Sequence, residues 1–294
     1  MSNRYEYRIA DLTLRTEGSH SNLSELVAGF RPFAVEPSDS EPTMLFRSDV
    51  EINEKEYDIR ELDHFDFPDA DADCYLCRHS EGHLFYMVRR SDGYRTTFVG
   101  NDNSPIVISD IGAYHRPDSS LLRFGLWVMF GIALTRNQAV AIHSSVIVKD
   151  NRAVMFLGES GTGKSTHTRL WRENIEGAHL LNDDSPIVRV VDGKAIAYGS
   201  PWSGKTPCYR NLCYPLAGIV RLSQAPHNKI RPLHVITAIG ALLPSCPPSF
   251  AYDAELQDRV CNIISEILRT TKVYHLECLP DGAAAELSSK TIFG

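Results

Sequence analysis

AVMFLGESGTGKSTHTRL, residues 153–170, is the most informative stretch of this 294-residue chain. Its first five residues are apolar, and a short continuous apolar run predicts a strand that is buried on both faces. The next eight residues, 158–165, match the phosphate-binding loop (Walker A) pattern G-x-x-x-x-G-K-[ST] at every fixed position. A helix is predicted from about Lys164 to Asn174, so the loop has the preceding strand and the following helix that the motif requires.

The composition of this loop suits a polyphosphate. Glycines let the backbone approach the ligand and adopt positive φ angles, and the N-terminus of the following helix favours an anion. We expect Lys164 to reach the β- and γ-phosphates, the Ser165 hydroxyl to bind Mg²⁺, and Thr166 to contact the α-phosphate. The predicted nucleotide-binding residues are Gly158, Glu159, Ser160, Gly161, Thr162, Gly163, Lys164, Ser165 and Thr166.

Composition and charge narrow the class of protein. The chain is 43% hydrophobic and 23% charged, with a formal net charge of −7 and a pI near 5.9. These values are typical of a globular protein, and because no basic stripe stands out we expect no nucleic-acid partner. The length favours two domains. The sequence leaves self-association into a homo-oligomer open.

The cysteines and the apolar runs bear on the compartment. Seven cysteines, an odd number, follow no disulfide framework, which is typical of a reduced, cytoplasmic protein. The N-terminus has no apolar signal core. The most apolar run, residues 124–134, is too short to span a membrane and predicts a buried helix. We therefore expect no membrane association.

Two carboxylates end the next predicted strand. Residues 179–184, HLLNDD, predict a short strand that terminates in Asp183 and Asp184. Because ligands bind outside the carboxyl ends of strands in open α/β sheets, we expect this pair beside the phosphates. One carboxylate would bind Mg²⁺ and the other would take a proton from the attacking group. We assign Asp183 to the metal together with Ser165 and leave open which aspartate is the base; a solvated turn or an N-cap is the alternative.

A histidine and a second polar loop are further catalytic candidates. His143 lies in the middle of a strand predicted over 139–148, where a histidine is either a core residue or a catalytic one. The loop GSPWSGK, residues 199–205, follows a hairpin predicted over 186–198 and includes an apparently exposed Trp202. We interpret it as a substrate or phosphate clamp in which Lys205 stabilises charge on the transferred group, with a plain turn as the alternative.

The N-terminal part predicts a separate domain. Residues 1–116 indicate a β-rich domain, with a meander formed by the runs 84–88 and 94–99, and residues 117–294 indicate a second domain that opens with a helix over 118–135. The acidic segment 36–73 is interpreted as a loop-rich surface with short strands, and a patch for a basic partner is the alternative.

Two cysteines and two histidines in the N-terminal part have the side-chain types of a zinc site. Cys74, Cys77, His79 and His83 are crowded into ten residues and overlap a predicted strand, so we favour a structural role over zinc. Downstream of the polar loop, the patterns predict a strand over 214–222, helices over 233–243 and 253–270, and a final strand over 272–279.

Residues 140–205 resemble the catalytic core of the HPr kinase/phosphorylase and ATP-dependent phosphoenolpyruvate carboxykinase superfamily. The resemblance rests on order and spacing: His143 one hairpin before the loop, GESGTGKS at 158–165, a short helix, and Asp183-Asp184 19 and 20 residues after Lys164. The segment SPWSGK, 200–205, matches neither type but is similar to that of HPr-kinase-related proteins.

The resemblance implies both a fold and a chemistry. The fold is α/β (α+β), with a phosphoenolpyruvate-carboxykinase-like P-loop mixed-sheet core behind the N-terminal β-rich domain. The chemistry is in-line transfer of the γ-phosphoryl group of ATP with Mg²⁺. Lys164 and Ser165 would hold nucleotide and metal, the Asp183-Asp184 pair would supply a metal ligand and the base, and His143 would lie near the phosphates.

An ATP-dependent kinase is therefore the expected function. It would transfer the γ-phosphoryl group to a hydroxyl of a protein, peptide or small molecule, chiefly by positioning and charge stabilisation. The N-terminal domain would select the acceptor. A nucleotide-binding regulatory or assembly module with little turnover is the alternative, followed by a carboxykinase-type enzyme.

Overall fold

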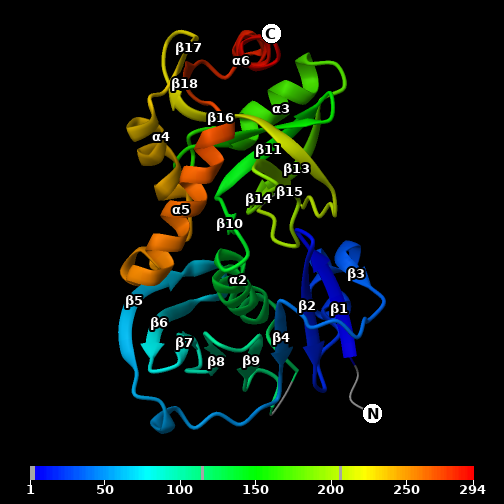
Figure 1. Cartoon of the computed structure of the whole chain (residues 1–294), viewed down its shortest axis with the longest axis vertical. Helices are drawn as coiled ribbons and strands as arrows, with labels where there is room; N and C mark the ends of the chain where they lie inside the picture. The colour runs from blue at the N-terminus through cyan, green and yellow to red at the C-terminus, as the bar shows by residue number, and fades with distance from the viewer. Residues whose placement is uncertain (1–3, 114–115, 205–206) are drawn as a thin grey trace. The chain divides into compact units, whose positions relative to one another are not determined.

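The computed structural model describes residues 4–113, 116–204 and 207–294, and the chain divides into two compact units (Figure 1). Unit 1 consists of residues 1–134 and 249–257, and unit 2 of residues 135–248 and 258–294. The boundary predicted after residue 116 lies before helix α2 (Ser119–Thr135), whereas the contacts group nearly all of α2 with unit 1.

Within the described residues, unit 1 is built on a mixed nine-stranded sheet of order β3-β1-β2-β4-β9-β8-β7-β6-β5. The β2–β4 and β4–β9 pairs are parallel and the others are antiparallel. The predicted meander is confirmed as β7 and β8. The strands are β1 (Arg4–Ile9), β2 (Leu12–Glu17), β3 (Ala34–Val35), β4 (Met44–Arg47), β5 (Arg60–Phe67), β6 (Ala72–His79), β7 (Gly82–Arg89), β8 (Arg95–Asn101) and β9 (Ile106–Ser109).

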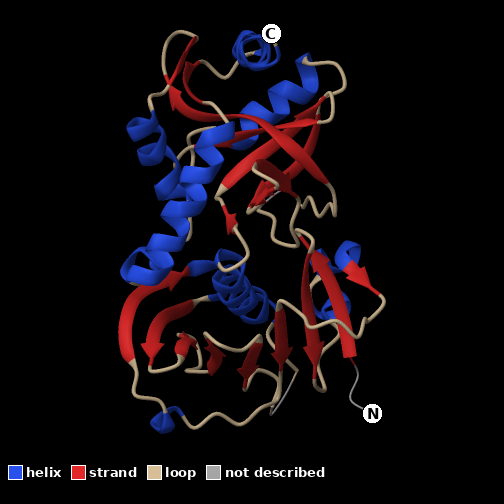
Figure 2. Cartoon of the chain, in the orientation of Figure 1, coloured by secondary structure: helices blue, strands red, loops and turns tan. Residues whose placement is uncertain are grey.

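Helix α2 lies against this sheet, as Figure 2 shows. The Asp118 carboxylate starts the helix by accepting the backbone N–H of Ser120 at 2.9 Å, as an N-cap residue does. The Phe124 ring stacks on Phe67 with centroids 4.1 Å apart. A Cβ on Gly125 would lie 2.2 Å from the Phe98 ring, so only glycine permits this close approach of helix to sheet. The apolar run of α2 is therefore buried against unit 1.

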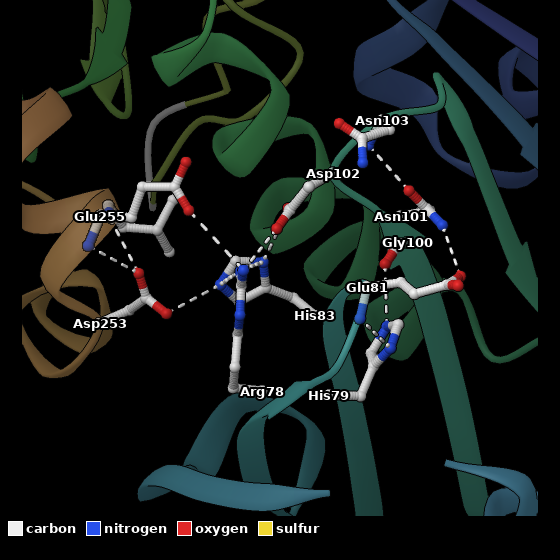
Figure 3. A network of polar contacts seen from close by, with 11 residues as sticks. Arg78, His79, Glu81, His83, Gly100, Asn101, Asp102, Asn103, Asp253 and Glu255 are labelled. Atoms are coloured by element: carbon white, nitrogen blue, oxygen red, sulfur yellow. Dashed lines mark hydrogen bonds and ion pairs between the residues drawn. The ribbon is translucent and has the colours of Figure 1, made fainter. Parts of the chain in front are cut away.

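A buried polar network fixes the segment 249–257 within unit 1 (Figure 3). His83 is 2% exposed, and its Nε2 lies 3.3 Å from Asp253 Oδ2 while its Nδ1 lies 3.6 Å from Asp102 Oδ1. Arg78 pairs with Asp102 at 2.6 Å and with Glu255 at 3.7 Å. The other Asp253 oxygen accepts the Glu255 N–H and caps helix α5 (Ala254–Thr270). These side chains join the start of α5 to the β6–β7 hairpin.

Unit 2 contains a second mixed sheet, nine-stranded within the described ranges. Its main order is β10-β14-β15-β16-β12-β11-β13, and β18 pairs with β16 and β17. Its strands are β10 (Ala139–Ala141), β11 (Ser144–Lys149), β12 (Arg152–Leu157), β13 (His179–Asp184), β14 (Ile187–Val191), β15 (Lys194–Tyr198), β16 (Cys213–Gln224), β17 (Lys229–Pro232) and β18 (Val273–Cys278).

Strand direction in this sheet brings four carboxyl ends to one edge. Strand β12 is parallel to β16, and β16 is parallel to β18. Strand β11 is antiparallel to both β12 and β13, so β13 also runs parallel to β12. The loop after β12, the two aspartates that end β13, and the ends of β16 and β18 therefore share the edge at which α/β sheets bind ligands.

Helices α3 (Lys164–Asn174) and α6 (Gly282–Phe293) pack together beside this sheet (Figure 1). They enclose an apolar core that includes Phe156 of β12 and Leu276 of β18. Ser288 of α6 joins the two helices, because its Oγ lies 2.9 Å from Trp171 Nε1 and 3.2 Å from His167 Nε2. Helix α4 (Val235–Leu242) follows β17, and α5 begins in unit 1 and continues into unit 2.

Two mixed sheets with several helices make an α+β fold. The predicted elements 153–157, 164–174, 179–184 and 253–270 are confirmed. The predicted continuous strand over 139–148 is wrong, because β10 ends at Ala141 and β11 begins at Ser144. The chain changes partner there, since β10 pairs with β14 and β11 with β12 and β13. No helix in the described ranges combines the length and the apolar character needed to cross a membrane.

Candidate active site

The phosphate-type loop between β12 and α3 is strongly curled. Gly158, Gly161 and Gly163 have φ angles of 156°, 81° and 104°, which side chains with a Cβ rarely adopt. A Cβ on Gly158 would lie 2.3 Å from Thr162 Oγ1, and that hydroxyl donates to Glu159 O at 2.8 Å. The first backbone N–H groups of α3 have no partner within the helix, so the loop ends in a position suited to an anion.

Lys164 lies over the first half of this loop. Its Nζ donates to Gly158 O at 2.7 Å and to Glu159 O at 3.2 Å. Burial lowers the pKa of the ammonium, and the nearby carboxylates of Asp184 and Asp183 oppose that shift. Among the described residues this partly buried ammonium donates to two neutral carbonyl oxygens, so it is well placed to exchange them for a phosphate.

Asp183 meets the loop directly. Ser165 Oγ donates to Asp183 Oδ1 at 3.0 Å, and the aspartate is only 8% exposed. Ser145 of β11 is in register with both Phe156 and Asp183, so the Asp183 side chain lies on the face of the sheet that α3 covers. A hydroxyl and a carboxylate oxygen in contact are the donors that Mg²⁺ prefers, so these residues fit the predicted metal role.

Asp184 points to the opposite face, because neighbouring residues of a strand alternate. Its Oδ1 lies 3.2 Å from His143 Nδ1, and the two side chains are 36% and 51% exposed, so the pair is accessible from solvent. The φ angle of Asp184 is 152°, a value that few residues other than glycine adopt. The two carboxylates are adjacent in the sequence but point to opposite faces of the sheet. Asp183 contacts the Ser165 hydroxyl of the loop, and Asp184 contacts His143.

His143 owes its position to the break between β10 and β11. The backbone N–H of Ile142 donates to Pro186 O at 3.0 Å, and that of His143 donates to Ser245 O at 2.6 Å. These bonds take the place of strand-to-strand hydrogen bonds at the point where the chain leaves its partner β14 and joins its partners β12 and β13. The histidine side chain is thus directed toward Asp184 at the sheet edge, which a core position in a continuous strand would not allow.

The second polar loop is anchored to β13 by a residue that sequence reasoning missed. Asn182 is fully buried, and its Nδ2 lies 3.0 Å from Trp202 O and 3.4 Å from the carbonyl oxygens of Ser200 and Cys208. Its Oδ1 accepts the Ser185 N–H at 3.0 Å. No sequence signal separates this asparagine from one on a surface turn, because the carbonyl groups of Ser200, Trp202 and Cys208 reach it only in the folded chain.

The same loop lies beside the aspartates. Gly204 N–H donates to Asp183 O at 2.7 Å, and Ser203 pairs with Asp184 in an isolated bridge. The expectation that Trp202 is exposed is wrong, because its side chain is 4% exposed. Lys205, predicted to stabilise the transferred group, lies outside the described residues.

A cavity of about 550 Å³ opens on the α3 side of the loop. Gly163, Thr166 and Leu170 line it from the loop and helix, and Ala225 and Leu279 line it from beyond β16 and β18. Because Thr166 is the residue predicted to contact an α-phosphate, this cavity continues from the phosphates in the direction in which a nucleoside would extend.

The zinc alternative has no support in the geometry. Burial raises the pKa of Cys74 to about 12 and that of Cys77 to about 11, so both are protonated thiols in the metal-free protein. His79 contacts Gly100 O, and His83 belongs to the network around Asp253. Across the part of the chain that the structure describes, no cluster of three or more His, Cys, Asp or Glu residues is arranged to hold a metal ion.

Comparisons with known proteins add little to this geometry. No protein-family model matches the chain, and no curated protein matches it. Among solved structures, one match is the HPr(Ser) kinase/phosphatase from Coxiella burnetii, at 12% identity over 52% of this chain and 93% of that chain, with a TM-score of 0.31. An identity of 12% and a TM-score of 0.31 are too low to assign a function to this chain.

Proposed function

We propose that this protein is a cytoplasmic ATP-dependent kinase with an HPr-kinase-like P-loop core, which transfers the γ-phosphoryl group to a hydroxyl. The observation that carries the proposal is the arrangement at the end of β13. Asp183 contacts Ser165 of the loop at 3.0 Å, and Asp184 contacts His143 at 3.2 Å on the other face. One carboxylate is thus committed to the loop hydroxyl, and the other is open to an incoming acceptor.

Nucleotide binding follows from the loop. The glycines of residues 158–163 and the first turn of α3 would surround the phosphates, and Lys164 would leave its two carbonyl partners for the β- and γ-phosphate oxygens. The cavity of about 550 Å³ beside Thr166 would receive the nucleoside.

Ser165 and Asp183 would hold Mg²⁺, with phosphate oxygens and water completing its ligands. When bound, the ion supplies positive charge that offsets charge on the β- and γ-phosphates. The remaining chemistry belongs to Asp184, which would accept the proton of the attacking hydroxyl. His143 Nδ1, within 3.2 Å, would donate a hydrogen bond that orients the carboxylate.

The first test of this proposal is calorimetric titration of Mg-ATP into the wild type and two lysine variants. Lys164→Ala should lose nearly all binding, because it removes the only side-chain cation that the loop itself contributes. Lys194→Ala is the matched control, since it removes an exposed lysine at the β14–β15 turn. Equal binding by wild type and Lys164→Ala would refute nucleotide binding at the loop.

The second test concerns transfer and needs no identified acceptor. Water can replace the hydroxyl, so slow release of label from γ-labelled ATP reports the same chemistry. Asp184→Asn should bind Mg-ATP normally but release label at least about a hundredfold more slowly, as loss of a general base predicts. Asp192→Asn, on an exposed turn, is the control. Tight ATP binding with no Asp184-dependent turnover would favour the regulatory-module alternative instead.

A further inference from the structure

A second cavity, of about 630 Å³, adjoins the cavity beside Thr166, and the two share Gly161, Thr162, Leu222 and Gln224 in their linings. The first half of the loop, residues 158–162, forms one wall, and β16, β17, β18 and α4 form the others. Three strands contribute Arg221, Ser223, Gln224, Arg231 and His275 to its lining, the loop contributes Glu159, Ser160 and Thr162, and α4 contributes Thr237.

Strand register brings the basic residues of this cavity together. Leu157 of β12 pairs with Arg221 of β16, Arg221 pairs with His275 of β18, and His275 pairs with Arg231 of β17. Paired residues of neighbouring strands lie on the same face of a sheet, so these side chains form one row. Phe156, one residue before Leu157, faces α3, so the row lies on the face away from α3.

The hydrogen bonds of this row fix the state of the histidine. Arg231 Nη2 lies 3.3 Å from His275 Nδ1, and Ser223 Oγ lies 2.9 Å from His275 Nε2. A guanidinium can only donate, so Nδ1 accepts and the ring proton is on Nε2. Burial lowers the pKa of His275, the guanidiniums of Arg231 and Arg221 lower it further, and the Glu277 carboxylate opposes them. A neutral His275 thus orients Arg231 without adding charge.

The two guanidiniums that line this cavity, those of Arg221 and Arg231, outnumber the one carboxylate that lines it, that of Glu159. The side chain of Arg221 makes no hydrogen bond or ion pair within the described part of the chain, although it lines the cavity. Glu277, two residues beyond His275, is in register with Lys229 of β17. Two guanidiniums beside an open volume are suited to bidentate recognition of a phosphate or carboxylate.

We propose that this cavity binds the anionic group, phosphate or carboxylate, of a small-molecule phosphoryl acceptor. The inference rests on the proposed kinase function and narrows its acceptor to a small hydroxy compound that carries a negative charge. Lys164 Nζ contacts the carbonyls of Gly158 and Glu159, and both residues line the cavity. The terminal phosphate that Lys164 binds would therefore lie at the mouth of the cavity.

The base lies on the same face of the sheet. Asp183 faces α3, so Asp184 faces the side on which the row of basic residues lies. Three strand spacings, about 14 Å, separate the backbones of β13 and β16, and the arginine and aspartate side chains shorten that gap. A metabolite-sized molecule anchored at Arg221 and Arg231 can present its hydroxyl between the γ-phosphate and Asp184.

The transfer step replaces one bond from oxygen to the γ-phosphorus with another. The acceptor oxygen forms a bond to the γ-phosphorus as the bond from that phosphorus to the β–γ bridging oxygen breaks. The bridging oxygen keeps the electron pair and leaves as part of ADP. The hydroxyl proton passes to Asp184, which later releases it to water.

The test is direct binding of small anions to the full chain saturated with Mg-ADP. The probes are inorganic phosphate, glycerol 3-phosphate and succinate, measured by calorimetry. Wild type should bind at least one, and Arg221→Gln and Arg231→Gln should each weaken binding by about tenfold or more, as loss of a charged hydrogen-bonding partner predicts. Arg269→Gln is the control, because Arg269 is exposed and pairs only locally with Glu266.

The three probes separate the sources of negative charge. Preference for glycerol 3-phosphate over inorganic phosphate indicates a phosphorylated organic acceptor, and preference for succinate indicates a carboxylate. Arg221→Lys keeps the charge but loses the planar guanidinium, so it should bind with intermediate strength. Circular dichroism will show whether Arg221→Gln folds. If it does not, Arg221→Lys still measures the contribution of the guanidinium to anion binding.

The outcomes separate this inference from the proposed function. If Mg-ATP binds but no probe does, or if the arginine variants bind as well as wild type, the anion site is refuted and the kinase proposal stands. Arginine-dependent probe binding without any ATP binding would refute the kinase and, with it, the acceptor role of the cavity.

Discussion

Replacement of Asn182 by alanine should weaken both the fold and the chemistry, because this buried amide fixes the loop beside the aspartates. The change removes two good hydrogen bonds, to Trp202 O at 3.0 Å and from Ser185 N–H at 3.0 Å, and three contacts of 3.4 Å. Trp202 O keeps a partner in Ser200 Oγ at 2.9 Å, but the buried Ser185 N–H loses the Asn182 Oδ1 that accepts it.

The size of the effect follows from these partners. Each lost hydrogen bond costs about 1 kcal/mol, and an unsatisfied buried N–H adds about 1–3 kcal/mol. We therefore expect Asn182→Ala to lower the free energy of unfolding by about 2–4 kcal/mol. Since no atom of Asn182 is in hydrogen-bond contact with the loop 158–165, Mg-ATP affinity should change by less than about threefold, whereas transfer should fall by about tenfold as residues 200–204 loosen.

Urea unfolding followed by circular dichroism measures the stability, and label release from γ-labelled ATP well below the transition measures transfer. Asn174→Ala is the matched control, because this exposed asparagine makes one local bond to Leu170 O at 2.8 Å and should cost less than about 1 kcal/mol. If Asn182→Ala unfolds within 1 kcal/mol of the control, the amide does not anchor the loop and the reasoning is wrong.

Three further predictions follow from single residues. Burial lowers the pKa of His167 to about 4 from an ordinary 6.5, so the unfolded chain gains a proton before the folded chain does as pH falls. The stabilisation that the neutral His167 provides is complete above pH 6.5 and is lost below it, so the free energy of unfolding of wild type should fall by about 2 kcal/mol between pH 7 and pH 5. Urea unfolding of His167→Gln at the two pH values should show a smaller fall. Gly158→Ala places a Cβ 2.3 Å from Thr162 Oγ1 at a φ of 156°, so it should lower the free energy of unfolding by about 1–3 kcal/mol and abolish measurable Mg-ATP binding in calorimetry. Gly193→Ala is the control, because its Cβ would have no atom within 4 Å, and it should leave ATP binding intact. His143→Gln should slow label release by about tenfold without changing the Kd for Mg-ATP, since the histidine touches Asp184 and not the loop; an unchanged rate would remove His143 from the mechanism.

The local pattern of the sequence was enough to predict the central elements of unit 2. The apolar run before the glycines, the lysine and serine that open a helix, and the strand that ends in two aspartates were all readable in order. They were readable because strand and helix periods, and the backbone freedom of glycine, are properties of a few neighbouring residues. The contact between Ser165 and Asp183 agrees with the pairing that the motif suggested.

Local patterns misjudged His143 and Trp202 for the same reason. A run of apolar residues around His143 predicts one strand, but the strand breaks there because its two halves pair with different neighbours. Trp202 lies in a polar, glycine-rich loop, yet it is buried because Asn182 draws that loop onto β13. Both outcomes depend on residues that are distant in the sequence.

The tertiary structure alone decided how the site is assembled. Alternation along β13 sends Asp183 to the loop and Asp184 to His143, and register across β12, β16, β18 and β17 places Arg221, His275 and Arg231 in one row. The sequence supplied these residues without indicating that they meet, since cross-strand register is set by packing of the whole sheet rather than by any one strand. The sequence by itself therefore determined the phosphate-type loop and its carboxylates, and the folded sheet determined what faces them.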